Sequence, residues 1–472
     1  MTKKYDKYKS VDQKWVVTIP AHWKMQRLKR ILQDRKERNN PIVTDYILSL
    51  TAKQGVVPVA QKEGAGGNKP KDDLTLYNLA HAGDLLVNCM NIVSGAAGVS
   101  KWDGAISPVY YPLFPRKEIE CNIWYYHRIF RLITFQRSLL GLGKGILMHE
   151  SSTGKLNTVR MRISMDYLNN VLLPLPPKEE QDQIVNYLDW QLSKINALIQ
   201  AKRKQIRLIE EHLHYAIHNA VTKGITPQAT MKDSGIFWLG EIPETWDAIK
   251  IKWLFDEDNE RNTGGTAELL SFSRKRGLIP FSEASDKQPS ASDLTNYRLV
   301  KPGQLLENRM QAWSGMFIHV TRNGCVSPDY SVFNPSSERY VNVNFYEYVF
   351  RNPLQVEQFA NASRGVGSGF NRLYTPAFGA IFTVYPPQEE QDAIVEYLDA
   401  LKDKYNVVIE KLDIEIQSLI ELRERLVSDV VTGQIDVRDI EIPEYEYVAD
   451  ITENDEDDDE DDDEEENQEE EE

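Results

Sequence analysis

The sequence is poor in cysteine and contains no long apolar run. Its three cysteines are Cys89, Cys121 and Cys325, and none belongs to a C-x-x-C pair. This pattern excludes a disulfide framework and argues against structural zinc. No stretch approaches the ~20 apolar residues of a membrane-spanning helix, and the N-terminal MTKKYDKYKS is charged throughout. We therefore expect a cytoplasmic protein with no membrane segment.

Catalytic motifs are also missing. The chain has no G-x4-G-K-[ST] phosphate loop, no N-P-P-[FYW] amino-methyltransferase motif and no Glu-x-Lys triplet of a nuclease. The glycine-rich stretches Gly141–Gly145 and Gly365–Gly369 lack the full dinucleotide fingerprint and favour flexible loops. His214 and His218 have the i, i+4 spacing of zinc ligands, but no adjacent Glu or third ligand accompanies them, so an exposed polar face is the better interpretation. We predict a non-catalytic chain that binds no cofactor or metal of its own.

The net charge of −17 is concentrated at one end of the chain. Of the 72 acidic residues, 18 lie in 450–472, which leaves 54 to balance the 55 Lys and Arg. Residues 1–40 are basic, with 12 Lys and Arg against 4 Asp and Glu. A near-neutral body with a basic end is compatible with nucleic-acid binding. The acidic end cannot bury enough apolar surface to fold and is predicted to be disordered.

A fourteen-residue signature occurs twice. PPKEEQDQIVNYLD begins at Pro176 and PPQEEQDAIVEYLD at Pro386, with eleven identical positions at an offset of 210. Proline and early glutamates suit the first turn of a helix, and no breaker follows until Gly224 and Gly433. The sequence therefore predicts two long helices of roughly 67 Å each.

Apolar residues recur at 3-4 spacing along both predicted helices, which indicates a coiled-coil seam. The polar seam positions Lys402 and Arg423 could be covered by the neighbouring Leu401 and Leu422, and Lys202 either fixes register or packs only its stem. The pairing should be antiparallel, because a compact connecting domain, with a radius of gyration of ~15 Å, cannot bridge a helix length. The predicted seam residues are Leu188, Leu192, Ile195, Ile199, Ile206, Ile209, Leu213, Leu398, Tyr405, Ile409, Leu412, Ile416, Leu419 and Leu426.

The duplication extends beyond the helices. W-x3-I-P-x2-W begins at Trp15 and again at Trp238, and Y-x5-G-x-L-L-x-N-x-M begins at Tyr77 and again at Tyr297. Short Val, Ile, Leu and Tyr runs between Gly and Pro turns predict a β-rich α+β domain in each copy. The fold class is thus two pseudo-twofold-related domains joined by two long helices in an antiparallel coiled coil. The predicted boundaries are 1–175 and 224–385 for the globular domains, 176–223 and 386–440 for the helices, and 441–472 for the acidic tail.

Basic and amide side chains occur in turns of both globular domains. Arg can pair bidentately with guanine, Asn or Gln with adenine, and Lys with phosphate, so these residues are candidate DNA contacts. For any single one, a solvated loop side chain is the better interpretation, and only the set as a whole supports the prediction. The candidates are Lys53, Gln54, Lys69, Lys71, Asn88, Asn91, Arg274, Lys275, Arg276, Asn308, Arg309, Gln311 and Arg364.

With these motifs together, the chain resembles the specificity subunits of type I restriction–modification systems. The resemblance covers nearly the whole chain and rests on the two helix openings, the Ile-Pro-x-x-Trp segments, the G-x-L-L strand and the Ser-Pro turns. It implies two target-recognition domains, each reading one half of a split sequence in double-stranded DNA. It also implies two methyltransferase subunits that supply S-adenosylmethionine chemistry, and two restriction subunits that use ATP and Mg.

Two other classes remain open. The chain could be a coiled-coil adaptor unconnected to DNA, or a stand-alone DNA-binding protein without methylase partners. The acidic end is no part of the family pattern, and its role is open. An independent nuclease or methylase is disfavoured by the missing motifs.

Overall fold

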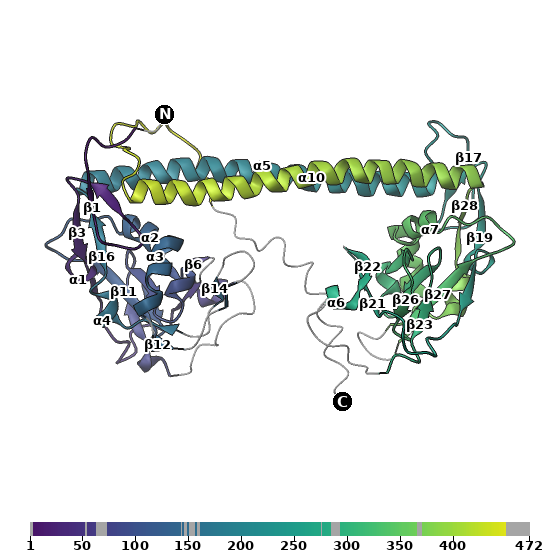
Figure 1. Ribbon diagram of the computed structural model, residues 1–472, viewed down its shortest axis with the longest axis horizontal. Coiled ribbons are helices and arrows are strands. Elements are labelled where there is room, and N and C mark those ends of the chain that lie inside the picture. Colours follow the sequence, from purple (N-terminus) through teal and green to yellow (C-terminus); the bar gives the residue numbers. More distant parts are fainter. Residues whose placement is uncertain are drawn as a thin grey trace. The chain divides into compact units, whose positions relative to one another are not determined.

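The computed structural model describes residues 3–51, 54–62, 73–142, 144–145, 149–150, 156–157, 161–274, 276–284, 293–365 and 371–449. The chain divides into two compact units. Of the described residues, unit 1 contains those up to Lys202 and 414–449, and unit 2 contains Arg203–Asp413. Each unit is a mixed α/β body that includes part of both long helices (Figure 1).

Two helices far longer than the others confirm the prediction from the repeated signature. Helix α5 spans Lys178–Lys223 and α10 spans Gln388–Val431, each with two glutamates in its first turn. Both end one or two residues before a glycine in the left-handed region, Gly224 at φ 74° and Gly433 at φ 73°. The second helix therefore stops well before the predicted boundary at 440, because Gly433 terminates it.

Unit 1 contains two main sheets. The first has the order β4 (Leu32–Asp34), β11 (Tyr110–Pro115), β8 (Leu85–Asn88) and β9 (Ala97–Val99), all antiparallel. The second has the order β6 (Gly55–Pro58), β5 (Ile47–Thr51), β10 (Gly104–Ile106) and β7 (Asn78–Ala80), with β5 and β10 parallel. Smaller elements complete the unit: β1 (Tyr8–Ser10) pairs with β2 (Thr18–Pro20), β3 (Lys24–Arg27) pairs with β16 (Leu172–Leu175), β13 (His149–Glu150) pairs with β14 (Leu156–Asn157), and the helices are α1 (Leu28–Ile31), α2 (Ile123–Arg131), α3 (Ile133–Ser138) and α4 (Met165–Leu168).

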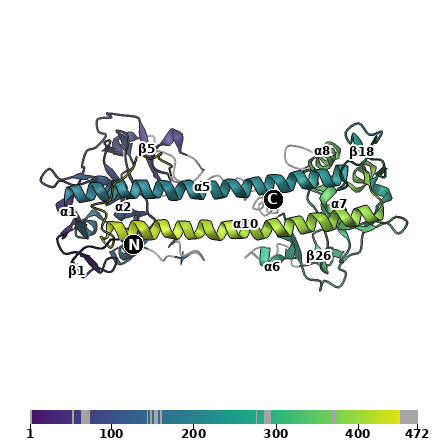
Figure 2. The same ribbon diagram turned by 90° about the horizontal axis from the view of Figure 1, so that it is seen from above.

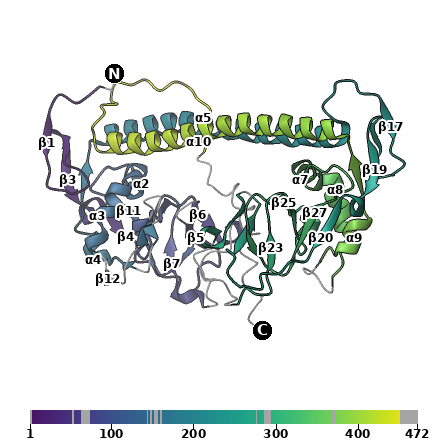
Figure 3. The same ribbon diagram turned by 45° about the vertical axis from the view of Figure 1, so that its right-hand side comes forward.

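Unit 2 repeats this topology. Its first sheet has the order β20 (Phe255–Asp258), β27 (Tyr330–Pro335), β24 (Leu305–Asn308) and β25 (Phe317–His319). The hairpin β21 (Leu270–Ser273) and β22 (Gly277–Pro280) adjoins the pair β23 (Arg298–Val300) and β26 (Gly324–Val326) through a parallel bridge from Leu269 to Cys325. The remaining bounds are β17 (Met231–Asp233) with β18 (Glu241–Pro243), β19 (Asp247–Lys250) with β28 (Phe382–Tyr385), α6 (Phe281–Ala284), α7 (Val343–Phe350), α8 (Pro353–Ala362) and α9 (Thr375–Ala380). Figure 3 shows α7, α8 and α9 beside the sheet of unit 2.

The largest hydrophobic core of each unit includes parts of both long helices. In unit 1, Ile184 and Leu188 of α5 pack with Val430 of α10 and with Ile435 and Val437 beyond it. In unit 2, a second core joins the end of α5 to the start of α10 and to the aromatic side chains of α7 and α8. The predicted first domain, 1–175, is therefore incomplete, because its core requires residues that follow α10.

Within each unit, α5 and α10 are antiparallel neighbours (Figure 2). In unit 1, Lys202 forms an ion pair with Glu415, and Asn196 Oδ1 accepts a hydrogen bond from Arg423 at 3.5 Å. Partner numbers on α10 thus rise as those on α5 fall. In unit 2, the Tyr405 hydroxyl lies 2.9 Å from His212 Nδ1.

The seam residues differ in their burial. The fully buried ones are Leu188, Leu192, Ile195, Ile199, Leu398 and Ile416. The half-buried ones are Ile206, Ile209, Leu213, Tyr405, Ile409, Leu412, Leu419 and Leu426. Leu401 is half-buried beside an exposed Lys402, as expected, but Leu422 is 51% exposed while Arg423 turns inward. Leu422 therefore does not cover the polar interruption, since Arg423 itself bonds across the pair.

Residues 441–449 are described and lie against α5, through hydrogen bonds such as Val448 N to Ser193 Oγ at 2.7 Å. The predicted start of the disordered tail at 441 is therefore too early.

Among the described residues, none of the helices is both long and apolar enough to cross a lipid bilayer. The described His, Cys, Asp and Glu side chains form no group of three or more suited to a metal ion. His218 lies 3.1 Å from the Asn352 side-chain amide.

Candidate nucleic-acid interface

The turn that follows the G-x-L-L strand has the same construction in both units. Asn88 Oδ1 accepts a hydrogen bond from the Met90 amide at 3.0 Å, and Asn308 Oδ1 accepts one from the Met310 amide at 3.1 Å. The two asparagines are only 7% and 3% exposed. Their side chains shape the turn, and a contact of these two residues with bases stays a prediction.

A pair of basic residues stands beside each turn. In unit 1, β12 (Lys144–Gly145) pairs with β15 (Met161–Arg162), which sets Lys144 opposite Arg162. In unit 2, Arg364 and Arg372 face each other, with both backbone hydrogen bonds at 3.0 Å. We call these the basic pairs. The duplication therefore places two cationic residues at one equivalent position of each domain.

Each basic pair is attached to the turn by one backbone hydrogen bond. The Ile163 amide donates to the Cys89 carbonyl at 2.9 Å, and the Leu373 amide donates to the Arg309 carbonyl at 3.0 Å. Lys144, Arg162 and Arg372 were absent from the sequence candidates. Arg162 and Arg372 share a position just before Ile163 and Leu373, an offset of 210, but the significance of this position appears only once the strand pairing is known.

In unit 2, further polar groups gather around residues 308–314. Arg309 Nε donates to the Asp329 carbonyl at 3.0 Å, and the Asp329 carboxylate lies 3.4 Å from Arg372 Nη2. Arg274 donates to the carbonyl and hydroxyl of Ser314 at 3.1 and 2.9 Å. Trp313 is 46% exposed, and its indole N–H donates to the Met310 carbonyl at 2.9 Å. Arg274, Arg309 and Arg372 are thus held around one turn that also presents an aromatic ring.

The other candidates are more dispersed. Arg276 is exposed and donates to the Glu283 carbonyl at 3.1 Å, Gln311 is half-buried, and Asn91 is exposed. Gln54 is half-buried, and its backbone N–H donates to Thr51 Oγ1 at 2.9 Å. Lys53, Lys69, Lys71 and Lys275 lie outside the described residues.

A buried carboxyl group lies directly before the unit 2 turn. Glu307 on β24 is 0% exposed, and the equivalent position in unit 1 is Val87. Burial raises the pKa of Glu307 to about 8, against smaller opposing effects from Ser331, Arg309 and Arg298. The carboxyl group is therefore mostly protonated and uncharged at neutral pH, so it does not offset the positive charge of the neighbouring turn.

The repeated signature attaches each long helix to its domain. In unit 1, Trp23 Nε1 donates to Glu180 Oε1 at 3.0 Å, and in unit 2 Trp246 Nε1 donates to Glu390 Oε2 at 2.6 Å. The second Trp of each W-x3-I-P-x2-W motif thus bonds to the second Glu of each P-P-x-E-E-Q motif. We call this contact the helix anchor. The sequence alone did not connect these two motifs.

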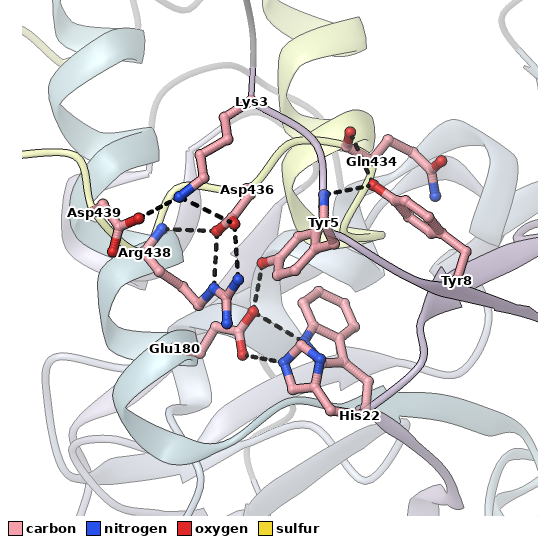
Figure 4. Close-up of polar contacts among 10 residues, drawn as sticks. Lys3, Tyr5, Tyr8, His22, Glu180, Gln434, Asp436, Arg438 and Asp439 are labelled. Atoms are coloured by element: carbon pink, nitrogen blue, oxygen red, sulfur yellow. Dashed lines mark hydrogen bonds and ion pairs between the residues drawn. The ribbon is translucent and has the colours of Figure 1, made fainter.

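Glu180 is the centre of a larger network in unit 1, shown in Figure 4. Tyr5 donates its hydroxyl proton to Glu180 Oε1, and His22 Nε2 lies 2.9 Å from Glu180 Oε2. Burial, together with the Glu180 carboxylate, raises the pKa of Tyr5. The Arg438 guanidinium lies 4.8 Å from the Tyr5 ring centre and binds both Asp436 carboxylate oxygens, at 2.9 and 2.8 Å. The N-terminal residues and those after α10 are therefore held together at the start of α5.

The next two signature residues repeat the same bonds. Gln181 Oε1 and Gln391 Oε1 accept from the amides of Asn122 and Asn342, both at 2.9 Å. The side-chain amides of those asparagines donate to Asp182 and Asp392, both at 2.7 Å. The signature thus fixes the first helical turn to the residue that caps α2 or α7.

Comparison with known proteins identifies relatives of one kind. The chain is 23% identical over 444 residues to the type I restriction enzyme MjaX specificity subunit of Methanocaldococcus jannaschii, covering 89% of this chain and 95% of that protein. It is 37% identical over 87 residues to the MjaVIII specificity subunit of the same organism, covering 18% and 19% of the two chains. No family model matches.

Among solved structures, the chain is similar to one from a study of complex assembly and conformational transition of the type I R-M system. The TM-score is 0.61 at 14% identity, covering 88% of this chain and 98% of that one. This likeness concerns the fold.

Proposed function

We infer that the chain is the DNA-specificity subunit of a type I restriction–modification system. The observation that carries the inference is the duplicated domain, in which a basic pair and a shaped turn recur next to an anchored long helix. The full-length similarity to a specificity subunit supports it. Its task is to recognise a DNA target and to direct the chemistry of partner subunits to it.

Each domain would read one half of a bipartite target. Exposed arginines such as Arg162 and Arg364 can pair bidentately with guanine or bind phosphate. The turns differ in chemistry between the units, because Cys89 and Val93 stand where unit 2 has Arg309 and Trp313. Two domains of one fold with different turns suit two different half-sites. The paired long helices would then set the gap between them.

Catalysis would belong to the partners. We propose that two methyltransferase subunits bind this chain and supply S-adenosylmethionine chemistry, and that two restriction subunits supply ATP- and Mg-dependent motor and nuclease activity. This division accounts for a chain without phosphate-loop, methyltransferase or nuclease motifs. The chain itself would act as a binding scaffold rather than as an enzyme.

A methylation assay with the reconstituted methyltransferase–specificity complex tests the proposal. The double variant Arg364→Ala, Arg372→Ala should no longer recognise one half-site, because each bidentate pairing with a base that it removes is worth roughly 1–3 kcal/mol. Arg425→Ala, at an 81% exposed side chain on α10, is the matched control and should methylate normally. Unchanged sequence preference in the double variant would remove the basic pair from the interface.

A further inference from the structure

Residues 441–449, which we call the strap, lie along one face of α5 in unit 1. Ser193 Oγ donates to the Glu446 carbonyl at 2.9 Å and accepts from the Val448 amide at 2.7 Å. Asn196 Nδ2 donates to the Val448 carbonyl at 3.1 Å. Helix side chains thus hold the strap by its backbone.

Nearer the start of α5, the same face of the helix binds the residues that precede the strap. Gln183 Nε2 donates to the carbonyls of Val437 and Ile440, at 3.0 and 2.6 Å. Positions 183, 187, 190, 193 and 196 follow the 3-4 spacing of one helix face. Along it, Tyr187, Ser193 and Asn196 are only 8%, 2% and 7% exposed. This face of α5 is therefore covered.

The equivalent face of α10 in unit 2 is open. Adding the repeat offset of 210 gives Ala393, Tyr397, Ala400, Asp403 and Asn406, all of them exposed. Tyr397 is 44% exposed, against 8% for its counterpart Tyr187. The described chain therefore covers one of two homologous helix faces and leaves the other accessible.

The open α10 face combines apolar and acidic groups. Tyr397 lies on this face, and Val407, which is 50% exposed, continues it along the helix. Glu396, Asp399 and Asp403 are exposed nearby, with Lys402 and Lys404 as the adjacent cations. A face that combines Ala393, Tyr397 and Ala400 with carboxylates on it and beside it fits an amphipathic helix that carries basic residues.

We propose that the α10 face docks a basic amphipathic helix of a methyltransferase subunit, and that the strap occupies the equivalent α5 face until a second methyltransferase subunit displaces it. This rests on the proposed function and adds an order of binding to it. The first subunit binds an open site, while the second competes with a segment of the specificity subunit itself. If the strap is closed 90–99% of the time, the second affinity is lowered roughly 10- to 100-fold.

Native mass spectrometry of a titration with the methyltransferase subunit of the same system tests the order. Wild type should show two dissociation constants, the second about tenfold or more weaker. Deleting 441–472 should bring the second constant close to the first, whereas deleting only 450–472 is the matched control and should preserve the difference between them. Val448→Pro removes the N–H that Ser193 accepts and should narrow this difference without shortening the chain. Tyr397→Glu should weaken the first binding event.

The outcomes separate the two proposals. Two equal affinities in wild type, or a difference unchanged by both strap variants, would overturn the strap inference and leave the proposed function standing. If Tyr397→Glu left the first dissociation constant unchanged, the first methyltransferase subunit would not bind the α10 face, and that part of the proposal would be overturned. If no methyltransferase subunit bound any form of the chain, the proposed function itself would fail.

Discussion

Replacing the buried Glu307 by valine should make unit 2 more stable at neutral and alkaline pH. Valine is the residue at the equivalent position of the other repeat, Val87, so the fold accepts it on the same strand. In the folded state burial raises the pKa of Glu307 from 4.5 to about 8. The folded protein therefore retains a proton that the unfolded chain releases, and wild type loses stability as the pH rises from about 4.5 to about 8.

The size of the effect follows from this pKa difference. One pH unit corresponds to about 1.4 kcal/mol, so the stability difference between variant and wild type should widen by about that amount per unit up to pH ~8. Above pH ~8 it should level off. The total is at most about 5 kcal/mol, because relaxation around the carboxylate reduces it.

Urea unfolding, followed by pulsed hydrogen exchange of the β24 peptide, measures the free energy of unfolding of unit 2 in variant and wild type. Wild type and Glu307→Val are compared between about pH 6 and 9, with Glu307→Gln as a second variant that preserves side-chain shape. In both variants the free energy of unfolding relative to wild type should increase with pH by the same amount. A stability difference independent of pH in this range would show that Glu307 is not held protonated in the folded state.

Three further predictions concern the anchor, the helix pair and the acidic end. Glu180→Ala leaves the fully buried Trp23 indole N–H without its acceptor and should lower the stability of unit 1 by about 1–3 kcal/mol in chemical denaturation, with unit 2 unaffected. Ile195→Asp places a carboxylate at a 6% exposed seam position and should abolish hydrogen-exchange protection in the middle of α5, at a cost of several kcal/mol; retained protection would contradict the seam assignment. Deleting 450–472 removes 18 carboxylates and should raise non-specific DNA affinity at low salt, with the difference fading as salt increases; equal affinities across the series would leave only a solubilising role.

The long helices and the duplication could be predicted because they depend on local signals. The Pro-Pro-x-Glu-Glu openings, the apolar 3-4 spacing and the terminal glycines each determine helix position without reference to the rest of the chain. The end of α10 shows the same rule, since Gly433 terminates the helix before the predicted domain boundary at 440.

The candidate interface was harder to predict because it depends on contacts between distant residues. Asn88 and Asn308 have the chemistry of base readers, but burial and an intraloop hydrogen bond assign them to the turn. Arg372 is placed opposite Arg364 by strand pairing that one sequence does not reveal. The acidic composition of the chain end predicts disorder, whereas backbone hydrogen bonds to α5 and the packing of Ile442 against the unit 1 core hold the strap in place.

The proposed function depends above all on each repeat reading its own half of a split DNA target. Genome-wide methylation mapping tests this directly, in a host that carries a chimaera whose residues 28–171 come from a relative. These boundaries lie between β3 and β16 and retain Trp23, Glu180 and the strap. We predict that one half of the methylated sequence changes while the other half and the gap stay the same. A change in both halves, or in the gap, would contradict the assignment of one half-site to each repeat.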